Sequence, residues 1–180
     1  MTPDADLLKL AAKGNEPAFV SLYQRHQGPL FRFTLHMSGQ VETAEEIVQE
    51  IFLSLLTDSR NFVPGKGTLQ GYLIGIARNM LRTRLRQNQR FVSDASEPVS
   101  PHSELFDALS KQQDLQDLRS AILSLPPNYR EVVVLCDIEG LDYSQTASHL
   151  ACPVGTVRSR LHRARAVLSA KMQKRIRCSA

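Results

Sequence analysis

Residues 152–177 read CPVGTVRSRLHRARAVLSAKMQKRIR, and the rest of the chain is best understood outward from this stretch. Its apolar side chains recur every three or four residues, which predicts one packed face of a helix. They are Val154, Val157, Leu161, Ala164 and Leu168. The opposite face and its edges carry Gly155, Arg158, Ser159, Arg160, His162, Arg163 and Ala166.

Positive charge dominates this helix. From Gly155 to the C-terminus there are eight Lys or Arg residues and no Asp or Glu. A helix with one packed face and one cationic face can bind a polyanion such as a nucleic acid. Taken alone, a basic helix is more often a solvated surface, so the surrounding sequence has to decide between the two.

A short helix and a tight turn are expected just before the basic helix. Asp142 or Ser144 can cap a helix that ends at Leu150. Pro153 then suits the first turn of the next helix. A short helix, a turn and a longer helix with a cationic outer face are typical of a helix-turn-helix, whose second helix enters the major groove of DNA.

Further helices are expected upstream, and no segment has the alternation of a strand. The predicted N-caps are Asp4 or Asp6, Asn15, Thr43 in a capping box with Glu46, Thr68, and Asn128. Residues 111–125 should form a helix that Pro126–Pro127 ends. Its packed face would hold Leu115, Leu118, Ile122 and Leu125. The sequence therefore predicts an all-α protein.

Two predicted helices in the N-terminal part have outer faces that could bind a partner or a nucleic acid. The helix after Thr43 has an acidic face that also holds Leu53, and this face is either a partner surface or a solvated face with one stray leucine. The helix after Thr68 places Tyr72 inward and Arg78, Arg82 and Arg86 outward. The loop before it carries Phe62 and Lys66. Cations beside a loop with aromatic residues suit single-stranded nucleic acid.

Composition narrows the class of protein. The net charge is +4, with basic residues concentrated in 78–90 and at the C-terminus. Residues 91–110 hold acidic, Ser and Pro residues without Lys or Arg, as expected of a linker. His149 and Cys152 alone cannot complete a zinc site, so no metal or other cofactor is expected. We expect a cytoplasmic protein that does not insert into membranes, because no signal peptide or long apolar run is visible.

Four segments resemble one known family. Residues 125–168 (LPPNYREVVVLCDIEGLDYSQTASHLACPVGTVRSRLHRARAVL) are similar to region 4 of sigma factors in the extracytoplasmic function group (ECF, group 4) of the sigma-70 family. Region 2 of the same group is similar to AEEIVQEIFLSLL (44–56) and YLIGIARNMLRTRLR (72–86), with AFVSLYQRH (18–26) before them. The two blocks occur in the family's order and cover most of the chain.

This resemblance implies two small helical domains joined by a flexible linker. Residues 1–90 would be the region 2 bundle, 91–112 the linker and 113–180 the region 4 helix-turn-helix. Such proteins bind core RNA polymerase and direct it to promoter DNA. Region 4 reads the −35 element as a duplex, and region 2 melts and holds the −10 element. They are usually restrained by an anti-sigma factor, often a membrane-bound one.

The resemblance also assigns residues to roles. The −35 element would be read by Arg158, Ser159, His162 and Arg163. The −10 element would be bound by Lys66, Tyr72, Arg78, Asn79 and Arg82. Core polymerase would dock on Glu46, Gln49, Glu50 and Leu53. The chain departs from the family at Tyr72, where Trp is common, and around Pro64 and Lys66, so its −10 base preference stays open.

The sequence argues against two other functions. A stand-alone regulator of the response-regulator type would use residues 126–177 to bind DNA, but a receiver domain needs alternating strands and a phospho-accepting Asp. An enzyme would need a nucleophile–base pair, a metal cluster or a phosphate loop. The PGKGT stretch at 64–68 lacks the spacing of a P-loop, so no catalytic residue is predicted.

Overall fold

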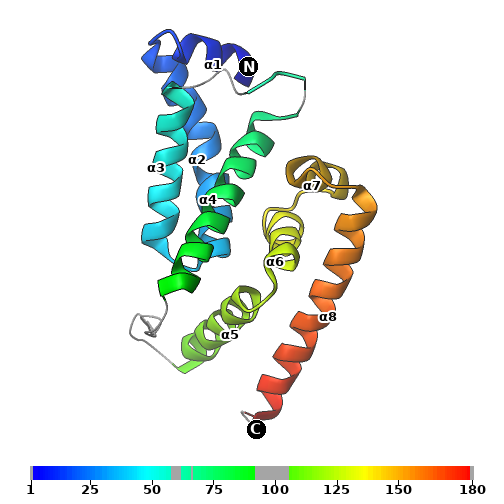
Figure 1. Ribbon diagram of the computed structural model, residues 1–180. Helices are drawn as coiled ribbons and strands as arrows, with labels where there is room; N and C mark the ends of the chain where they lie inside the picture. The colour runs from blue at the N-terminus through cyan, green and yellow to red at the C-terminus, as the bar shows by residue number, and fades with distance from the viewer. Residues whose placement is uncertain (1, 58–61, 66, 92–105, 179–180) are drawn as a thin grey trace.

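A computed structural model describes residues 2–57, 62–65, 67–91 and 106–178, and all regular secondary structure in these residues is helical (Figure 1). In chain order the helices are α1 (Asp4–Ala11), α2 (Glu16–Ser38), α3 (Val41–Thr57), α4 (Leu69–Phe91), α5 (Phe106–Leu123), α6 (Pro127–Val133), the π-helix η2 (Val134–Ile138), α7 (Tyr143–Leu150) and α8 (Val154–Cys178). The prediction of an all-α protein is confirmed for these residues.

Helices α1–α4 form the N-terminal half. Figure 1 shows α2, α3 and α4 side by side, with α1 lying across one end of them. Their shared core is made of large apolar side chains that are almost fully buried, namely Leu22, Leu30, Phe33, Ile47, Ile51, Leu73 and Ile74. This core fixes the direction of α3 and α4, whose outer faces carry most of the N-terminal residues of functional interest.

Three predicted helix caps are confirmed. The Asn15 side chain accepts a hydrogen bond from the Ala18 amide at 3.0 Å, and Thr68 Oγ1 accepts one from the Gly71 amide at 3.1 Å. Asp142 caps α7 in a reciprocal capping box with Gln145. Each cap satisfies an amide that the first turn of a helix would otherwise leave unpaired.

The other three caps are wrong. Pro3 occupies the N-cap position of α1, and the Asp4 carboxylate is instead committed to side chains of α2. Helix α3 begins two residues before Thr43, whose hydroxyl donates to the Gln40 side chain rather than capping. Pro126 is the N-cap residue of α6, with no side-chain cap, because the chain turns into the helix before Asn128.

The C-terminal half comprises α5–α8. Helix α8 packs on α5, α6 and α7, and the core between them buries Leu125, Val132, Leu135 and Leu161. Helix α5 begins at Phe106, and α4 continues to Phe91. Residue 91 and residues 106–112, which the sequence placed in the linker, are therefore helical.

Two leucines of α5 that were expected on its packed face are exposed. Leu115 is 56% exposed and Leu118 is 39% exposed, whereas Ala121 and Ile122 are buried. Helix α5 therefore packs through its C-terminal end. The prediction of a helix from the spacing of apolar residues was correct. An apolar face of a helix is buried, however, only where neighbouring helices reach it.

The two halves lie against each other. Helix α4 packs on α7, and α2 packs on α5, α6 and η2 (Figure 1). At one edge of this contact, the Gly39 turn approaches the Leu123 side chain so closely that a Cβ there would lie 2.8 Å from Leu123 Cδ1. The chain is thus closed, with the face of α4 covered in part by the helix-turn-helix.

Candidate nucleic-acid and partner interfaces

The helix-turn-helix consists of α7, a turn of three residues and α8. Ala151 adopts a left-handed conformation with φ 50°, and the Cys152 amide donates to the Ala147 carbonyl at 3.0 Å. This reverses the chain within the three residues between the helices. Val157, Leu161 and Ala164 are buried as predicted, but Val154 is 40% exposed because it stands at the first residue of α8, beyond the packed face.

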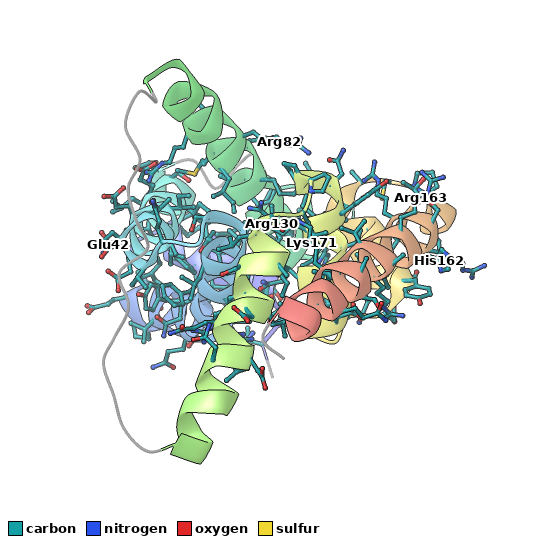
Figure 2. All side chains as sticks on the ribbon, turned by 90° about the horizontal axis from the view of Figure 1, so that it is seen from below. Glu42, Arg82, Arg130, His162, Arg163 and Lys171 are labelled. Carbon is teal, nitrogen blue, oxygen red and sulfur yellow. The ribbon has the colours of Figure 1, made fainter. Side chains whose placement is uncertain are left out.

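The predicted −35-reading residues share the exposed face of α8. The four side chains are Arg158, Ser159, His162 and Arg163. Figure 2 shows His162 and Arg163 on α8 well away from the N-terminal half. The Ser159 hydroxyl donates to the Thr156 carbonyl at 3.1 Å, so this helix already holds it in a fixed orientation. The face is thus open to a DNA groove in the closed chain.

Two other cations of α8 are engaged by the C-terminal half itself. The Arg165 guanidinium donates to both oxygens of Asp137 at 3.2 and 2.5 Å, and this hydrogen bonding raises the pKa of Arg165. The Lys171 ammonium donates to Ser124 Oγ at 2.5 Å. Not every cation of the basic helix is therefore available to bind a nucleic acid. The spacing of charges did not reveal this, since the acceptors come from residues far along the chain.

Four of the five residues predicted to bind the −10 element lie in the described part of the chain. Asn79 is exposed beside the half-buried Tyr72, whose ring lies 5.6 Å from that of Phe62. Arg82 is 45% exposed and lies 3.5 Å from Glu131. Lys66 lies outside the described residues.

Arg78 differs from its prediction. It was expected to face outward, yet only 13% of its side chain is exposed. Its Nε and Nη2 atoms each donate to a Glu131 carboxylate oxygen at 2.9 Å, and Nη1 donates to the Leu150 carbonyl at 3.2 Å. Arg78 does point away from the core of its own half, but the other half covers it. Periodicity along one helix cannot reveal such a distant neighbour.

A groove of about 530 Å³ opens beside Arg78 between α4 and α7. Its lining includes Phe62, Val63, Gly67, Thr68, Gly71, Tyr72, Gly75, Ile76, Asn79 and, from α7, Ser148 and His149. His149 Nε2 lies 3.2 Å from Thr68 Oγ1, while its Nδ1 has no hydrogen-bond partner. Burial lowers the pKa of His149, so the imidazole is held neutral. The groove has aromatic walls and polar edges from both halves.

The acidic face of α3 is exposed along its length. Glu46, Gln49, Glu50 and Leu53 all lie on it, and Leu53 is 63% exposed. Sequence reasoning missed Arg84 of α4, which donates from Nη1 to Glu46 at 2.7 Å and from Nη2 to Glu50 at 2.8 Å. The two carboxylates stand four residues apart, so one guanidinium can bridge both.

No group of His, Cys, Asp or Glu suited to a metal ion occurs among the residues that the structure describes. Within the same residues, no helix is long and apolar enough to cross a membrane. These surfaces carry charge, amides and aromatic rings, which suits recognition of a polymer.

Comparison with known proteins gives a family for both halves. Residues 22–91 match the family model of sigma-70 region 2, and residues 115–168 match that of sigma-70 region 4. The ECF RNA polymerase sigma factor SigE of Mycolicibacterium smegmatis is 34% identical to this chain. The match covers 83% of this chain and 59% of that protein. EcfG of Rhodopseudomonas palustris is 33% identical, over 77% of this chain and 76% of that protein.

Two solved structures are similar over nearly the whole chain. The sigma factor RpoE of Bartonella quintana, in complex with the anti-sigma factor NepR, has a TM-score of 0.69 at 27% identity, covering 86% of this chain and 96% of that one. CnrH in complex with the cytosolic domain of CnrY has a TM-score of 0.71 at 26% identity, covering 95% and 97%. The helix-turn-helix, the region 2 bundle and these likenesses agree, and the chain belongs to the ECF sigma factors of the sigma-70 family.

Proposed function

We propose that this protein is a promoter-specificity subunit that binds core RNA polymerase and directs transcription initiation. The observation that supports this most strongly is that one chain carries two separate surfaces whose chemistry suits nucleic acid, the exposed cationic face of α8 and the groove beside α4 with its aromatic lining. A regulator that reads one operator needs only the first. The second matches the need of a protein that also holds a melted strand.

The −35 element is the ligand of α8 in this proposal. Arg158 and Arg163 can donate to guanine O6 and N7 or to phosphate, and His162 and Ser159 supply shorter polar contacts. Their exposure in the closed chain supports this role, since no rearrangement within the C-terminal half is needed to present them.

The −10 element is the ligand of α4 and its preceding loop. Asn79 and Tyr72 border the groove and can hydrogen-bond to or stack on an unpaired base. Lys66, Arg78 and Arg82 supply cations for the strand's backbone. We assign 1–90 and 113–180 as the two working domains, with the segment between them as their tether.

Core polymerase docks on the acidic face of α3, through Glu46, Gln49, Glu50 and Leu53. An exposed leucine surrounded by charged residues supports this assignment, because protein interfaces bury an apolar anchor within a polar rim. The protein would act in the cytoplasm, where bacterial RNA polymerase meets the chromosome. It is a binding protein rather than an enzyme, and it uses no cofactor.

An anti-sigma factor is the expected regulator. The solved relatives with the same overall arrangement are bound to NepR and to the cytosolic domain of CnrY, respectively. By similarity, a separate inhibitor, soluble or membrane-bound, would bind this chain.

The experiment that tests the proposal is reconstitution with purified core RNA polymerase. The full chain should co-elute with core enzyme in size-exclusion chromatography and should permit initiation on DNA fragments from its own bacterium. Tight binding to duplex DNA without polymerase, together with no association with core enzyme, would instead identify a stand-alone regulator.

A further inference from the structure

The acidic face of α3 contains a cation that belongs to another helix. Arg84 of α4 donates from Nη1 to Glu46 Oε2 at 2.7 Å and from Nη2 to Glu50 Oε1 at 2.8 Å. Both distances are short, as expected of hydrogen bonds between charged groups. Arg84 therefore lies within the surface proposed to bind core polymerase, although it comes from the helix proposed to bind the −10 element.

The packing of α4 directs Arg84 toward α3. Ala77 and Leu81 are buried in the core, and Arg84 follows them at helical spacing on the same side of α4. Figure 1 shows the C-terminal part of α4 beside the N-terminal part of α3, which is where the two glutamates stand. The guanidinium thus reaches the acidic face from the edge of the core.

Each glutamate gives one oxygen to Arg84 and keeps the other. Within the described residues, Arg84 is the only donor that bonds to either carboxylate. Glu46 Oε1 and Glu50 Oε2 are therefore left to accept hydrogen bonds from a partner. Without Arg84, two like charges one turn apart would repel each other, and each side chain would sample several rotamers. The bridging arginine holds both remaining oxygens in one orientation before a partner binds.

We propose that Arg84 is a positioning residue for core polymerase, which acts by orienting Glu46 and Glu50. This inference rests on the proposed function, in which both glutamates bind core polymerase. A surface whose side chains are already ordered loses less conformational freedom on binding. It therefore binds more tightly than a surface whose carboxylates are mobile.

A masking role for Arg84 would have the opposite sign. If the guanidinium only neutralised the carboxylates, its removal would strengthen attraction to a cationic partner. Positioning is favoured because one oxygen of each carboxylate stays available. The two carboxylates also outnumber the one guanidinium, so the surface stays acidic with Arg84 in place.

The test measures binding of the full chain and its variants to purified core RNA polymerase. Arg84→Met keeps a long apolar side chain and removes the guanidinium, and it should weaken binding about fivefold or more. Arg84→Lys keeps the charge but loses the paired donors, so it should restore only part of the affinity. The loss should appear as faster dissociation, because changes within one interface act mainly on the dissociation rate.

Arg25→Met is the matched control. The Arg25 side chain on α2 is 25% exposed, against 27% for Arg84, and its Nη1 donates to Asp4 Oδ1 at 2.9 Å. Arg25 pairs with α1 rather than with α3, so its loss should leave polymerase binding unchanged. Urea unfolding of both variants shows whether they lose similar stability.

A second background makes the test specific to the two glutamates. In a chain that carries both Glu46→Gln and Glu50→Gln, Arg84 has no carboxylate to orient. Adding Arg84→Met to that chain should therefore change the affinity for core polymerase by less than about twofold. A merely structural role would give the same loss in both backgrounds.

Tighter or unchanged binding by Arg84→Met, or an equal loss in the two backgrounds, would overturn the positioning role. Each of these results leaves the proposed function standing, since the wild type still binds core polymerase and initiates transcription. Failure of the wild type to bind core polymerase would instead overturn the proposed function and this inference with it.

Discussion

Arg163 illustrates what a single side chain on α8 can contribute. It is exposed on the outer face of the helix, beside His162, whereas Arg165 two residues later is bound by Asp137. The two arginines are close in sequence but differ in what holds their guanidinium groups. Mutating each of the two arginines can therefore distinguish the reading of a base from a general effect of positive charge.

Arg163→Ala is expected to weaken binding to the preferred −35 sequence by about 1–3 kcal/mol and to relax preference at one base pair. Arg165→Ala is the control and should change binding little, since its partner lies within the protein. Polymerase–promoter affinities measured over a set of −35 variants would decide. An equal loss on every variant would show that Arg163 contacts phosphate rather than a base.

Gly71 and Gly75 stand one turn apart on α4 and differ in what surrounds them. A Cβ at Gly71 would lie 2.7 Å from Cδ2 of His149, whereas a Cβ at Gly75 would meet nothing within 4 Å. Both changes to alanine favour the helix by about 0.5–1 kcal/mol. Only the first collides with the other half.

Gly75→Ala should therefore raise the free energy of unfolding by that amount and keep the chain compact. Gly71→Ala should separate α4 from α7 and increase the radius of gyration. Urea unfolding together with small-angle scattering would measure both effects. The close approach of Gly71 to α7 would be unimportant if the two variants behaved alike.

At the scale of elements, α3 buries one face in the core and leaves the other face exposed. Its inner face is buried through Ile47 and Ile51, and its outer face holds Leu53. Arg84 from α4 fixes the two glutamates on that face. The helix can thus support the docking surface that we propose on its outer face.

Leu53→Ala should change the free energy of unfolding by no more than about 0.5 kcal/mol, because the side chain is exposed. It should weaken binding to core polymerase about tenfold, as loss of an apolar anchor does. Leu10→Ala on α1, also an exposed leucine at 43%, should leave binding unchanged. Titration of labelled protein with core enzyme gives both affinities, and equal values for the two variants would remove Leu53 from the interface.

The contact of α2 and α4 with the C-terminal half contains two histidines with lowered pKa. Burial lowers the pKa of His149. Burial also lowers the pKa of His36, where Glu139 opposes the shift and Arg119 and Arg32 add to it. Each imidazole is neutral in the closed chain and binds a proton more readily once exposed.

The contribution of these two histidines to the stability of the closed chain over the open chain is therefore fully present above their ordinary pKa of 6.5. It declines as the pH falls below that value. Hydrogen exchange in α4 and α7, corrected for its intrinsic pH dependence, should reveal more opening at pH 5.5 than at pH 7.5. The variant His149→Gln should reduce this difference. Greater protection at the lower pH would contradict the sign.

At the scale of the molecule, the sequence predicted the helices better than their assembly. Helical periodicity and the caps at Asn15, Thr68 and Asp142 are local, and the structure confirms them. The exposed face of α8 was also predictable, because Val157 and Leu161 fix which side packs.

The closure of the two halves could not be predicted in the same way. It depends on pairs such as Arg78 with Glu131 and Arg32 with Glu139, which are 53 and 107 residues apart in the chain. Neither residue of a pair carries a local signal for the other. The same reason explains why Arg78 was expected to be free and why the role of Arg84 was missed.

Mapping of transcription start sites tests the central claim most directly. Fragmented DNA from the protein's own bacterium would be transcribed by core RNA polymerase with and without this protein, and the RNA 5′ ends would be sequenced. We predict new start sites that share a −35 and a −10 element at a fixed spacing. Start sites identical to those of core enzyme alone, or new ones without shared upstream elements, would contradict a promoter-specificity subunit.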